Sequence, residues 1–266
     1  MKGFIYYEEA DAVRNRWFID ELIKAGSVYD LDVELRVEDE TGLDSADFIV
    51  YRGRDFEVSR KWEQDGMLVV NRSEVNRIAN DKLQTFQLGA LLGIPAIPTK
   101  LVTSADAIHE YPVVVKTVDG HGGEDVHLCE TVAEVEQTIS RYIGRQLLVQ
   151  PFIEHNSSDI RLYVIGDEVV GSVRRTGVNN FKANVTLGGT AERFDAPAPL
   201  RDFAERIAKA LKSDYIGVDF IQNNGGVWLL NEIEDPVGAR SLYETSELNV
   251  AQEVMRHIHK KLLKSL

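Results

Sequence analysis

Residues 1–70 alternate between short apolar runs and amphipathic stretches. The apolar runs, which have the length and composition of β-strands, lie at residues 3–7, 31–37, 47–52 and 67–70. Between the first two runs, apolar side chains recur at helical spacing: Val13, Trp17, Phe18, Leu22 and Ile23. This order predicts a small βαβ-type layer with a mainly parallel sheet. No G-x-G-x-x-G sequence follows the first run, which argues against a dinucleotide site there.

The middle of the chain predicts a helix, a connector, and then strands with a second helix among them. We expect a helix over residues 81–93, capped by Asn80 or Asp81 and stopped by Gly93. Its apolar face is expected to contain Leu83, Phe86, Leu88, Leu91 and Leu92. After a proline-punctuated connector, we expect a helix at 131–143, with Thr131 and Glu134 at capping-box spacing. Strands are predicted around it at 112–118, 126–129 and 146–153.

The last part of the chain predicts antiparallel strands flanked by helices. A hairpin over 159–175 is expected to turn at Gly166-Asp167. The elements that follow are a helix at 200–212, strands at 214–222 and 226–234, and a final helix at 247–263. The fold class is therefore α/β followed by α+β. We expect the domains to divide as 1–75, 76–153 and 154–266.

Composition and charge narrow the class of protein. The chain has 266 residues, with 30 Lys and Arg against 43 Asp and Glu, and a formal net charge of −13. This balance argues against general affinity for nucleic acid, although it permits a local basic pocket. Cys129 is the only cysteine, which fits a reducing compartment. Because no signal-peptide pattern and no run of about 18 apolar residues occurs, we expect a cytoplasmic protein without a membrane partner.

Three carboxylates occupy two neighbouring predicted strands: Asp219, Glu232 and Glu234. Glu232 and Glu234 share a face, because alternate residues of a strand point the same way. With Asp219 beside them, the three would repel one another unless a cation lies between them. Oxygen-only ligation suits a hard ion, so we predict Mg²⁺ that bridges phosphate oxygens. The alternative is a solvated sheet face, which the apolar neighbours disfavour.

Lys116 lies among valines and is followed by Gly120, Gly122 and Gly123. Burying a lysine is costly unless an anion meets it, and glycines let backbone N–H groups approach phosphates. Together these residues indicate a phosphate site, although the Walker A sequence is absent. The alternative is an edge-strand lysine beside an ordinary Gly-rich hairpin.

Further cations could concentrate positive potential in one cleft: Lys82, Arg161, Arg174, Arg175 and Lys182. The alternative is that each is a surface charge paired with a nearby acid. A zinc site built from His121, His127 and Cys129 is disfavoured, because their spacing matches no usual ligand pattern. A Cys129 nucleophile is disfavoured as well, since a lone cysteine in an apolar strand is usually part of the core.

Taken in order, these motifs resemble the ATP-grasp fold, and within it the RimK-like carboxylate–amine (glutamate) ligases. The resemblance is carried, within residues 76–240, by NDKLQTFQLGALLGIPAIPT, VVVKTVDGHGGEDV, LVQPFI, DIRLYVIGDEVVGSVRR, FKANVTLGG, GVDF and NEIEDPVGAR. The short N-terminal layer is compatible with the pre-ATP-grasp domain of that family.

The resemblance implies a role for each matching residue. Lys82 and Lys116 would meet the nucleotide phosphates, under a lid formed around Gly120, Gly122 and Gly123. The adenine edge would lie against a hinge made of Gln150, Pro151, Phe152 and Ile153, with Asp159 on the ribose side. Arg161 and Arg174 would lie near the transferred phosphate. Later in the chain, Lys182 would act in catalysis and in nucleotide binding, and Asn184 in nucleotide binding. Asp219, Glu232 and Glu234 would hold two magnesium ions, for which Mn²⁺ could substitute.

Three features depart from the family pattern, and one of them is the lid sequence GHGGED, which is not the commonest form in the family. Glu232-Ile233-Glu234 replaces the usual E-x-N, which adds a negative charge and makes Asn231 a candidate for a supporting role. Pro151 stands where the hinge usually has an acidic residue. Since proline has no N–H, we expect the adenine contacts to move to Phe152 and Ile153.

The implied activity is that of an ATP- and Mg²⁺-dependent carboxylate–amine ligase. ATP would phosphorylate the carboxylate of an amino acid or peptide, and an amine would attack the acyl phosphate to give an amide, ADP and phosphate. Arg240 is our candidate anchor for the substrate carboxylate, with a structural salt bridge as the alternative. A phosphotransferase acting on a hydroxyl and a nucleotide-binding protein without ligase activity also stay open. Because the N-terminal layer is short, a homo-oligomer that completes the substrate cleft is a further open alternative.

Overall fold

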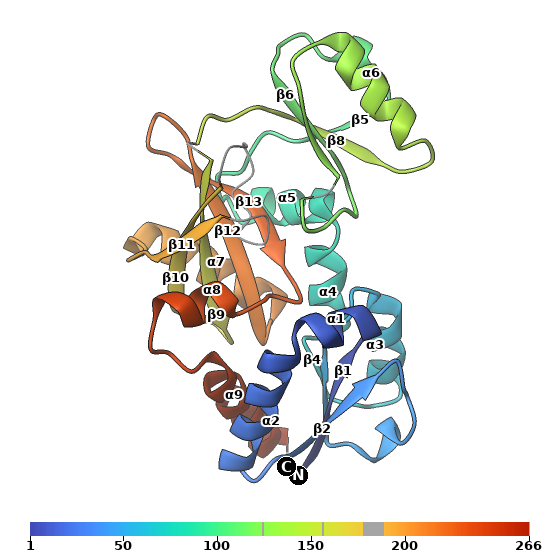
Figure 1. The fold of residues 1–266 in the computed structure, drawn as a ribbon, viewed down its shortest axis with the longest axis vertical. Helices are drawn as coiled ribbons and strands as arrows, with labels where there is room; N and C mark the ends of the chain where they lie inside the picture. Colours follow the sequence, from blue (N-terminus) through green and yellow to red (C-terminus); the bar gives the residue numbers. More distant parts are fainter. Residues whose placement is uncertain (124, 156, 178–188, 266) are drawn as a thin grey trace.

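The computed structural model describes residues 1–123, 125–155, 157–177 and 189–265. Its N-terminal layer is a four-stranded parallel sheet in the order β2-β1-β3-β4. The strands are β1 (Lys2–Tyr7), β2 (Asp32–Val37), β3 (Phe48–Tyr51) and β4 (Val69–Val70). They are connected by α1 (Glu9–Arg14), α2 (Arg16–Val28), the 3-10 turn η1 (Leu43–Ser45) and α3 (Phe56–Gln64). The prediction of a small parallel layer is confirmed (Figure 1, blue).

The helical stretch after β1 differs in detail from the prediction. It is divided into α1 and α2 at Asn15, the residue between them. Val13 is 76% exposed, so the predicted apolar face was wrong at that position. The buried face of α2 is formed instead around Phe18, Ile19 and Leu22, because the break rotates α1 away from the core.

Two helices, α4 (Ser73–Ala79) and α5 (Lys82–Leu91), lead into a small antiparallel sheet in the order β5-β8-β6-β7. Its elements are β5 (Lys100–Val102), η2 (Ala105–Ala107), β6 (Val113–Thr117), β7 (Val126–Cys129), α6 (Val132–Arg141) and β8 (Leu147–Pro151). Asp81 caps α5 as expected, by accepting a hydrogen bond from the Gln84 N–H. The predicted apolar face of α5 was wrong at Leu91, which is 83% exposed. The buried face holds Lys82, Thr85 and Phe86 instead. Its first residue, Lys82, lines the cavity described below, so this face of α5 is not wholly apolar.

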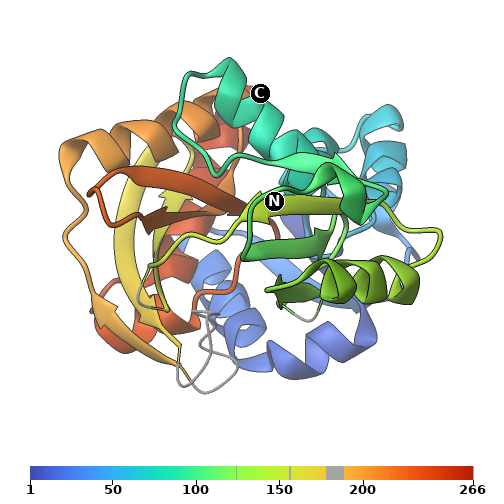
Figure 2. The same cartoon turned by 90° about the horizontal axis from the view of Figure 1, so that it is seen from above.

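The third part is a five-stranded antiparallel sheet in the order β11-β10-β9-β12-β13. Its strands are β9 (Ser158–Ile165), β10 (Glu168–Thr176), β11 (Thr190–Arg193), β12 (Tyr215–Gln222) and β13 (Trp228–Glu234). Helix α7 (Ala198–Leu211) packs on one face through a cluster that includes Leu162, Val218 and Ile207. The opposite face packs against α8 (Arg240–Thr245), which the sequence pattern missed, and α9 (Val250–Ser265). Figure 2 shows α7 and α9 on either side of the strands.

The N-terminal layer and the large sheet share one hydrophobic core. Side chains of α2, such as Phe18 and Leu22, belong to the same buried cluster as Val254 and Met255 of α9. Buried Asn71 joins the two parts as well: its amide donates to the Tyr215 carbonyl at 2.6 Å and accepts from the Tyr215 N–H at 2.9 Å. The carboxyl ends of β1 and β3 are therefore fixed beside the large sheet. Within the described ranges, no helix is long and apolar enough to cross a membrane.

Candidate functional site

A row of charged side chains crosses the large sheet on the face opposite to α7. The register places Arg175 opposite Asp159, Arg161 opposite Asp219, and Asp219 opposite Glu232. Arg161 donates to both oxygens of Asp219 at 2.7 Å, and its Nη2 also reaches Glu234 at 3.0 Å. Arg175 donates to Asp159 at 2.7 and 2.6 Å and to Asp219 at 2.6 Å. The pairs are bidentate, which fixes the orientation of each guanidinium.

Burial and charge act in opposite directions on these carboxyl groups. Burial alone would raise the pKa of Asp219, but Arg161 and Arg175 outweigh it and hold that pKa below its usual range. The pKa of Glu234 is also lowered, since the charges of Arg161 and Arg54 outweigh its burial. For Asp159 burial prevails and raises the pKa in spite of Arg175. Asp219 and Glu234 are thus ionised when the arginines are in place, which suits them to hold a cation.

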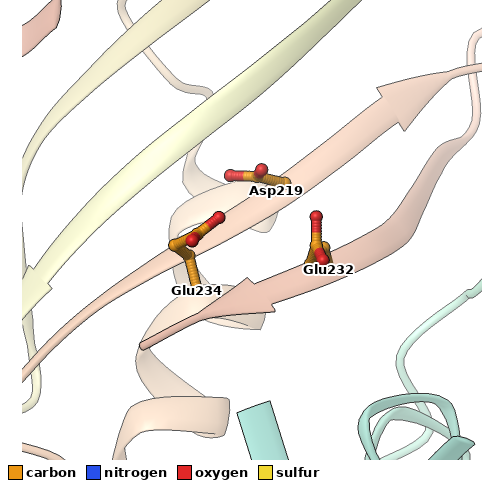
Figure 3. Close-up of side chains that lie close together, drawn as sticks. All are labelled: Asp219, Glu232 and Glu234. Carbon is orange, nitrogen blue, oxygen red and sulfur yellow. The ribbon is translucent and has the colours of Figure 1, made fainter. Parts of the chain in front are cut away.

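Figure 3 shows Asp219, Glu232 and Glu234 extending from the two neighbouring strands β12 and β13. One oxygen of each lies within 4.8 Å of the others. Ligand oxygens of an octahedral Mg²⁺ are about 3 Å apart when adjacent and about 4.2 Å apart when opposite, so the three oxygens would have to move closer together to bind one ion. A β-bulge between Asp219 and Phe220 places Glu232 and Asn231 side by side along the same cavity. The donor set is all oxygen, as Mg²⁺ prefers, and the site fits the predicted ion.

Two lysines, both predicted to meet phosphates, lie in the same region as the carboxylates. Lys82 is 3.1 Å from Glu232, and its ammonium also donates to the Gly120 carbonyl. Lys116 is buried, with its ammonium 5.3 Å from the centre of the Phe86 ring. Burial, with a smaller effect of the Lys82 charge, lowers the pKa of Lys116 to about 8. Within the described residues no ion pair neutralises Lys116, so an anion that enters here would find a cation already desolvated.

Arg145 anchors both ends of the loop that carries Gly120, Gly122 and Gly123. The guanidinium donates to Asp119 at 2.7 Å, before the glycines, and to Asp125 at 2.9 Å, after them. It also reaches the Thr117 hydroxyl at 3.2 Å. The ends of the loop are therefore held, while Gly122 and Gly123 adopt positive φ angles that glycine tolerates best.

The predicted hinge lies at the end of β8. Gln150 is buried and donates to the Thr99 hydroxyl at 2.6 Å, and Pro151 is the last residue of the strand. The Phe152 N–H donates to the Pro112 carbonyl at 3.1 Å, so this amide is engaged within the protein. In the described part of the chain, no hydrogen bond uses the Ile153 N–H. The expected shift of adenine contacts past Pro151 is therefore best met by Ile153.

One cavity of about 400 Å³ joins these groups. Its first end is lined by Lys82, Lys116, the glycines of the loop and the hinge residues. The carboxylates Asp219, Glu232 and Glu234 line its middle, together with Asp159 and Arg161. Its other end reaches the N-terminal layer at Tyr7, Arg52 and Arg54, and includes Arg240 at the start of α8. A volume of this order accommodates a ligand of nucleotide size.

The structure does not bring Arg174 into the row. Arg174 lies on the other side of β10, where it pairs with Glu192 at 3.1 Å and covers the Phe194 ring. The turn at Gly166-Asp167 would by itself pair Asp159 with Arg174, but a β-bulge between Val169 and Gly171 shifts the register by one residue. Arg175 therefore takes the place expected of Arg174.

The remaining candidates from the sequence are Arg240, two residues of the 178–188 stretch, and the disfavoured zinc and cysteine sites. Arg240 is exposed and lines the cavity, whereas Lys182 and Asn184 lie outside the described residues. The disfavoured zinc set does not form a cluster among the described residues, where the grouped metal-ligand candidates are the three carboxylates. Cys129 is buried 3.7 Å from the Thr138 hydroxyl, as a core residue would be.

Sequence reasoning missed the cations that the N-terminal layer contributes. Arg54 donates to Asn80 at 2.9 Å and lies 3.4 Å from Glu234, and Arg52 lines the cavity nearby. Arg52 directly follows β3, and Arg54 comes two residues later. The signal was available, because ligands of open parallel sheets bind at the carboxyl ends of the strands.

Comparison with known proteins places the chain in a family. Residues 79–258 match the model of the RimK-like ATP-grasp domain. The chain is 31% identical over 217 residues to a probable alpha-L-glutamate ligase of Shewanella sp. strain MR-4, covering 77% of this chain and 72% of that protein. It is 28% identical over 270 residues to the uncharacterized protein MG011 of Mycoplasma genitalium, covering 98% of this chain and 93% of that protein.

A crystal structure of D-alanine–D-alanine ligase from Bacillus anthracis complexed with ATP has the same fold. The TM-score is 0.76 at 14% identity, over 100% of this chain and 98% of that one. The fold and site geometry thus define an ATP-grasp protein. More narrowly, the chain belongs to the RimK-like ATP-grasp family. The expected fold and the expected class, a carbon–nitrogen ligase, are confirmed at this level.

The lowered pKa of Lys116 makes the stability of the ligand-free protein depend on pH. Its folded-state pKa of about 8 lies below the ordinary 10.5, so between these values the unfolded chain binds more protons and stability rises with pH. Urea denaturation of wild type and Lys116→Met at about pH 7.5 and pH 9.5 isolates this effect. Between the two pH values, we expect the unfolding free energy of wild type to rise by about 2 kcal/mol more than that of the variant. An equal pH dependence of the two proteins would contradict the burial of an ionisable lysine here.

Proposed function

We propose that this protein joins a carboxylate to an amine through an acyl phosphate, at the expense of ATP, with release of ADP and phosphate. The observation that carries the proposal is the single cavity in which Lys82, Lys116 and the Gly-rich loop lie next to three ionised or ionisable carboxylates. Cations that meet phosphates and carboxylates that hold a metal are both needed for phosphoryl transfer. The family and the ligase name of the Shewanella relative support the same reaction class.

The nucleotide would occupy the end of the cavity between the small and the large sheets. Lys82 and Lys116 are the groups proposed to meet its phosphates, under the loop that holds Gly120, Gly122 and Gly123. The hinge from Gln150 to Ile153 is proposed to receive the adenine. Asp159, held by Arg175, is proposed to face the ribose. These roles use groups that line one continuous cavity.

The metal site is assigned to Asp219, Glu232 and Glu234, with room in the donor set for two Mg²⁺ ions or for Mn²⁺ in their place. When bound, such ions neutralise charge on the phosphoryl oxygens. Lys82 beside Glu232 and Arg54 beside Glu234 hold these two carboxylates in the ligand-free protein. The same two contacts orient the carboxylates before any cation arrives.

The chemical difficulty is that a carboxylate is a poor electrophile at neutral pH. Arg161 and Lys116 face the place where the terminal phosphate would lie, and their positive charges would stabilise the transferring group. Arg161 is already oriented by Asp219 and Glu234, so little reorganisation is needed. The Gly-rich loop, anchored by Arg145, would exclude the water that hydrolyses an acyl phosphate. Arg175 replaces Arg174 in this scheme, as an orienting group for Asp159 and Asp219.

Phosphorus NMR with Mg-ATP tests the reaction class. We expect ADP and phosphate to accumulate when pooled amino acids and small carboxylates are present, and at least tenfold more slowly without them, because activation needs an acid. Splitting the pool would then identify the acid and the amine. AMP and pyrophosphate would instead show adenylation, and a stable phosphoester would show a phosphotransferase, and either product would overturn the proposal.

Arg240 is proposed to guide the substrate carboxylate into the cavity, since it is exposed and lies just beyond the metal-binding strand. We expect Arg240→Ala to raise the KM for the acid about tenfold, the effect of losing one charged hydrogen bond. The KM for ATP should stay within twofold of the wild-type value. An unchanged KM for the acid would leave Arg240 as a surface charge.

A further inference from the structure

The cavity continues past the metal-binding carboxylates to the N-terminal layer, where Tyr7 ends β1 and Arg52 follows β3. Both side chains line the cavity, although only 1% of Tyr7 and 5% of Arg52 are exposed. Neither residue is among those assigned to the nucleotide or the metal. Their polar groups therefore face whatever occupies the rest of the cavity.

Arg52 is a buried cation whose described contacts are with neutral groups. Its Nε donates to the Tyr7 hydroxyl at 3.1 Å, and its Nη2 donates to the Val237 carbonyl at 2.7 Å. The rings of Tyr7 and Phe18 lie 5.8 and 5.7 Å from its guanidinium carbon. Among the described residues, Arg52 forms no ion pair with a carboxylate.

The other buried arginines of the cavity differ from Arg52 in this respect. Arg161 pairs with Asp219 and Glu234, and Arg175 pairs with Asp159 and Asp219. Asp235 is a buried carboxylate whose charge acts on Arg52, but the two form no ion pair. The oxygens of Asp235 accept instead from Asn71 at 2.8 Å and from Asn76 at 3.1 Å. A buried guanidinium without a paired carboxylate is costly unless an anion binds to it.

Tyr7 adds a second donor to the same place. Its hydroxyl accepts the Arg52 hydrogen bond, so its own proton is available for an acceptor in the cavity. Among the described residues, no hydrogen bond is donated by the Tyr7 hydroxyl. Since Nε and Nη2 of Arg52 are engaged, and no hydrogen bond among the described residues uses Nη1, the guanidinium offers its Nη1 end. That end and the Tyr7 hydroxyl supply one donor each, and the oxygens of a carboxylate can accept from both.

We propose that Arg52 and Tyr7 bind a substrate carboxylate that the reaction does not activate. This inference rests on the proposed ligase function. The activated carboxylate must lie near Lys116, Arg161 and the metal ligands, whereas the contacts of Arg52 go to Tyr7 and Val237. The carboxylate at Arg52 is therefore an additional one, carried either by the acid substrate or by the amine substrate.

Steady-state kinetics with acid and carboxamide pairs test this assignment. Each substrate that supports turnover is compared with its analogue in which the additional carboxylate is a carboxamide. We expect Arg52→Gln to raise the KM for the free acid form tenfold or more, the effect of a lost charge-assisted pair. The KM values for the carboxamide and for ATP should change less than twofold, and Arg52→Lys should recover part of the loss. The substrate whose KM responds identifies which partner carries the carboxylate.

Equal effects of Arg52→Gln on the acid and the carboxamide, or no effect on either, would overturn the proposal. Tyr7→Phe removes one oxygen and is the second variant, for use if Arg52→Gln does not fold. It should raise the KM for the acid form severalfold and leave that of the carboxamide unchanged, and an unchanged KM for the acid would also overturn the proposal. Arg256→Gln, on the exposed side of α9 and outside the cavity, is the matched control.

Failure of the ligase function can be told apart from failure of this site. If wild type forms no ADP with any acid, equilibrium dialysis with L-glutamate and L-glutamine α-amide, each in the presence of Mg-ATP, replaces the kinetic test. Binding of L-glutamate that weakens tenfold in Arg52→Gln would support a carboxylate site in a protein with another activity. Binding that is equal in both proteins, or absent in wild type, would overturn it.

Discussion

Asp219 accepts hydrogen bonds from two buried arginines, Arg161 and Arg175, and the geometry of the cavity depends on this contact. A buried carboxylate between two guanidinium groups is stable only when strand register and side-chain orientation are both correct. Glycine at position 217 is part of that requirement, because a Cβ there would lie 3.3 Å from Arg161 Cδ and 2.8 Å from Val237 Cγ2. Loss of one charge would take a partner from each group that it contacts. Without Arg175, for example, Asp159 would be buried with no ion pair among the described residues.

This cluster connects the three parts of the chain. Arg161 reaches Glu234 on β13, and Glu234 in turn contacts Arg54 from the N-terminal layer. Glu232, on the same strand, contacts Lys82 of α5, which also bonds to the Gly-rich loop of the small sheet. Since each part supplies a cation to one set of carboxylates, the geometry of the proposed metal site depends on how the three parts are placed. The shared core of α2 and α9 keeps the N-terminal layer in position for this.

Much of the fold could be predicted, because strands and helices here follow their hydrophobic periods and the caps at Asp81 and Thr131 are clear. The three carboxylates could be predicted to share a face, since alternation within β13 fixes Glu232 and Glu234. Arg175 could not be distinguished from Arg174, because a β-bulge near Gly171 changes the parity of β10 without a turn signal. A Cβ at position 171 would lie 2.8 Å from Leu242, in α8, a helix that the pattern had not revealed. The position of Arg54 after β3 could have marked it as a candidate, but its contact with Glu234, which is distant in the sequence, has no local signature.

The central claim is that a substrate carboxylate becomes an acyl phosphate in this cavity. Transfer of oxygen-18 from a labelled carboxylate to inorganic phosphate tests it most directly, because the bridging oxygen of an acyl phosphate comes from the acid and leaves with the phosphate. The account predicts one labelled oxygen in the phosphate for each amide formed, detected by mass spectrometry. Unlabelled phosphate together with amide formation would contradict it.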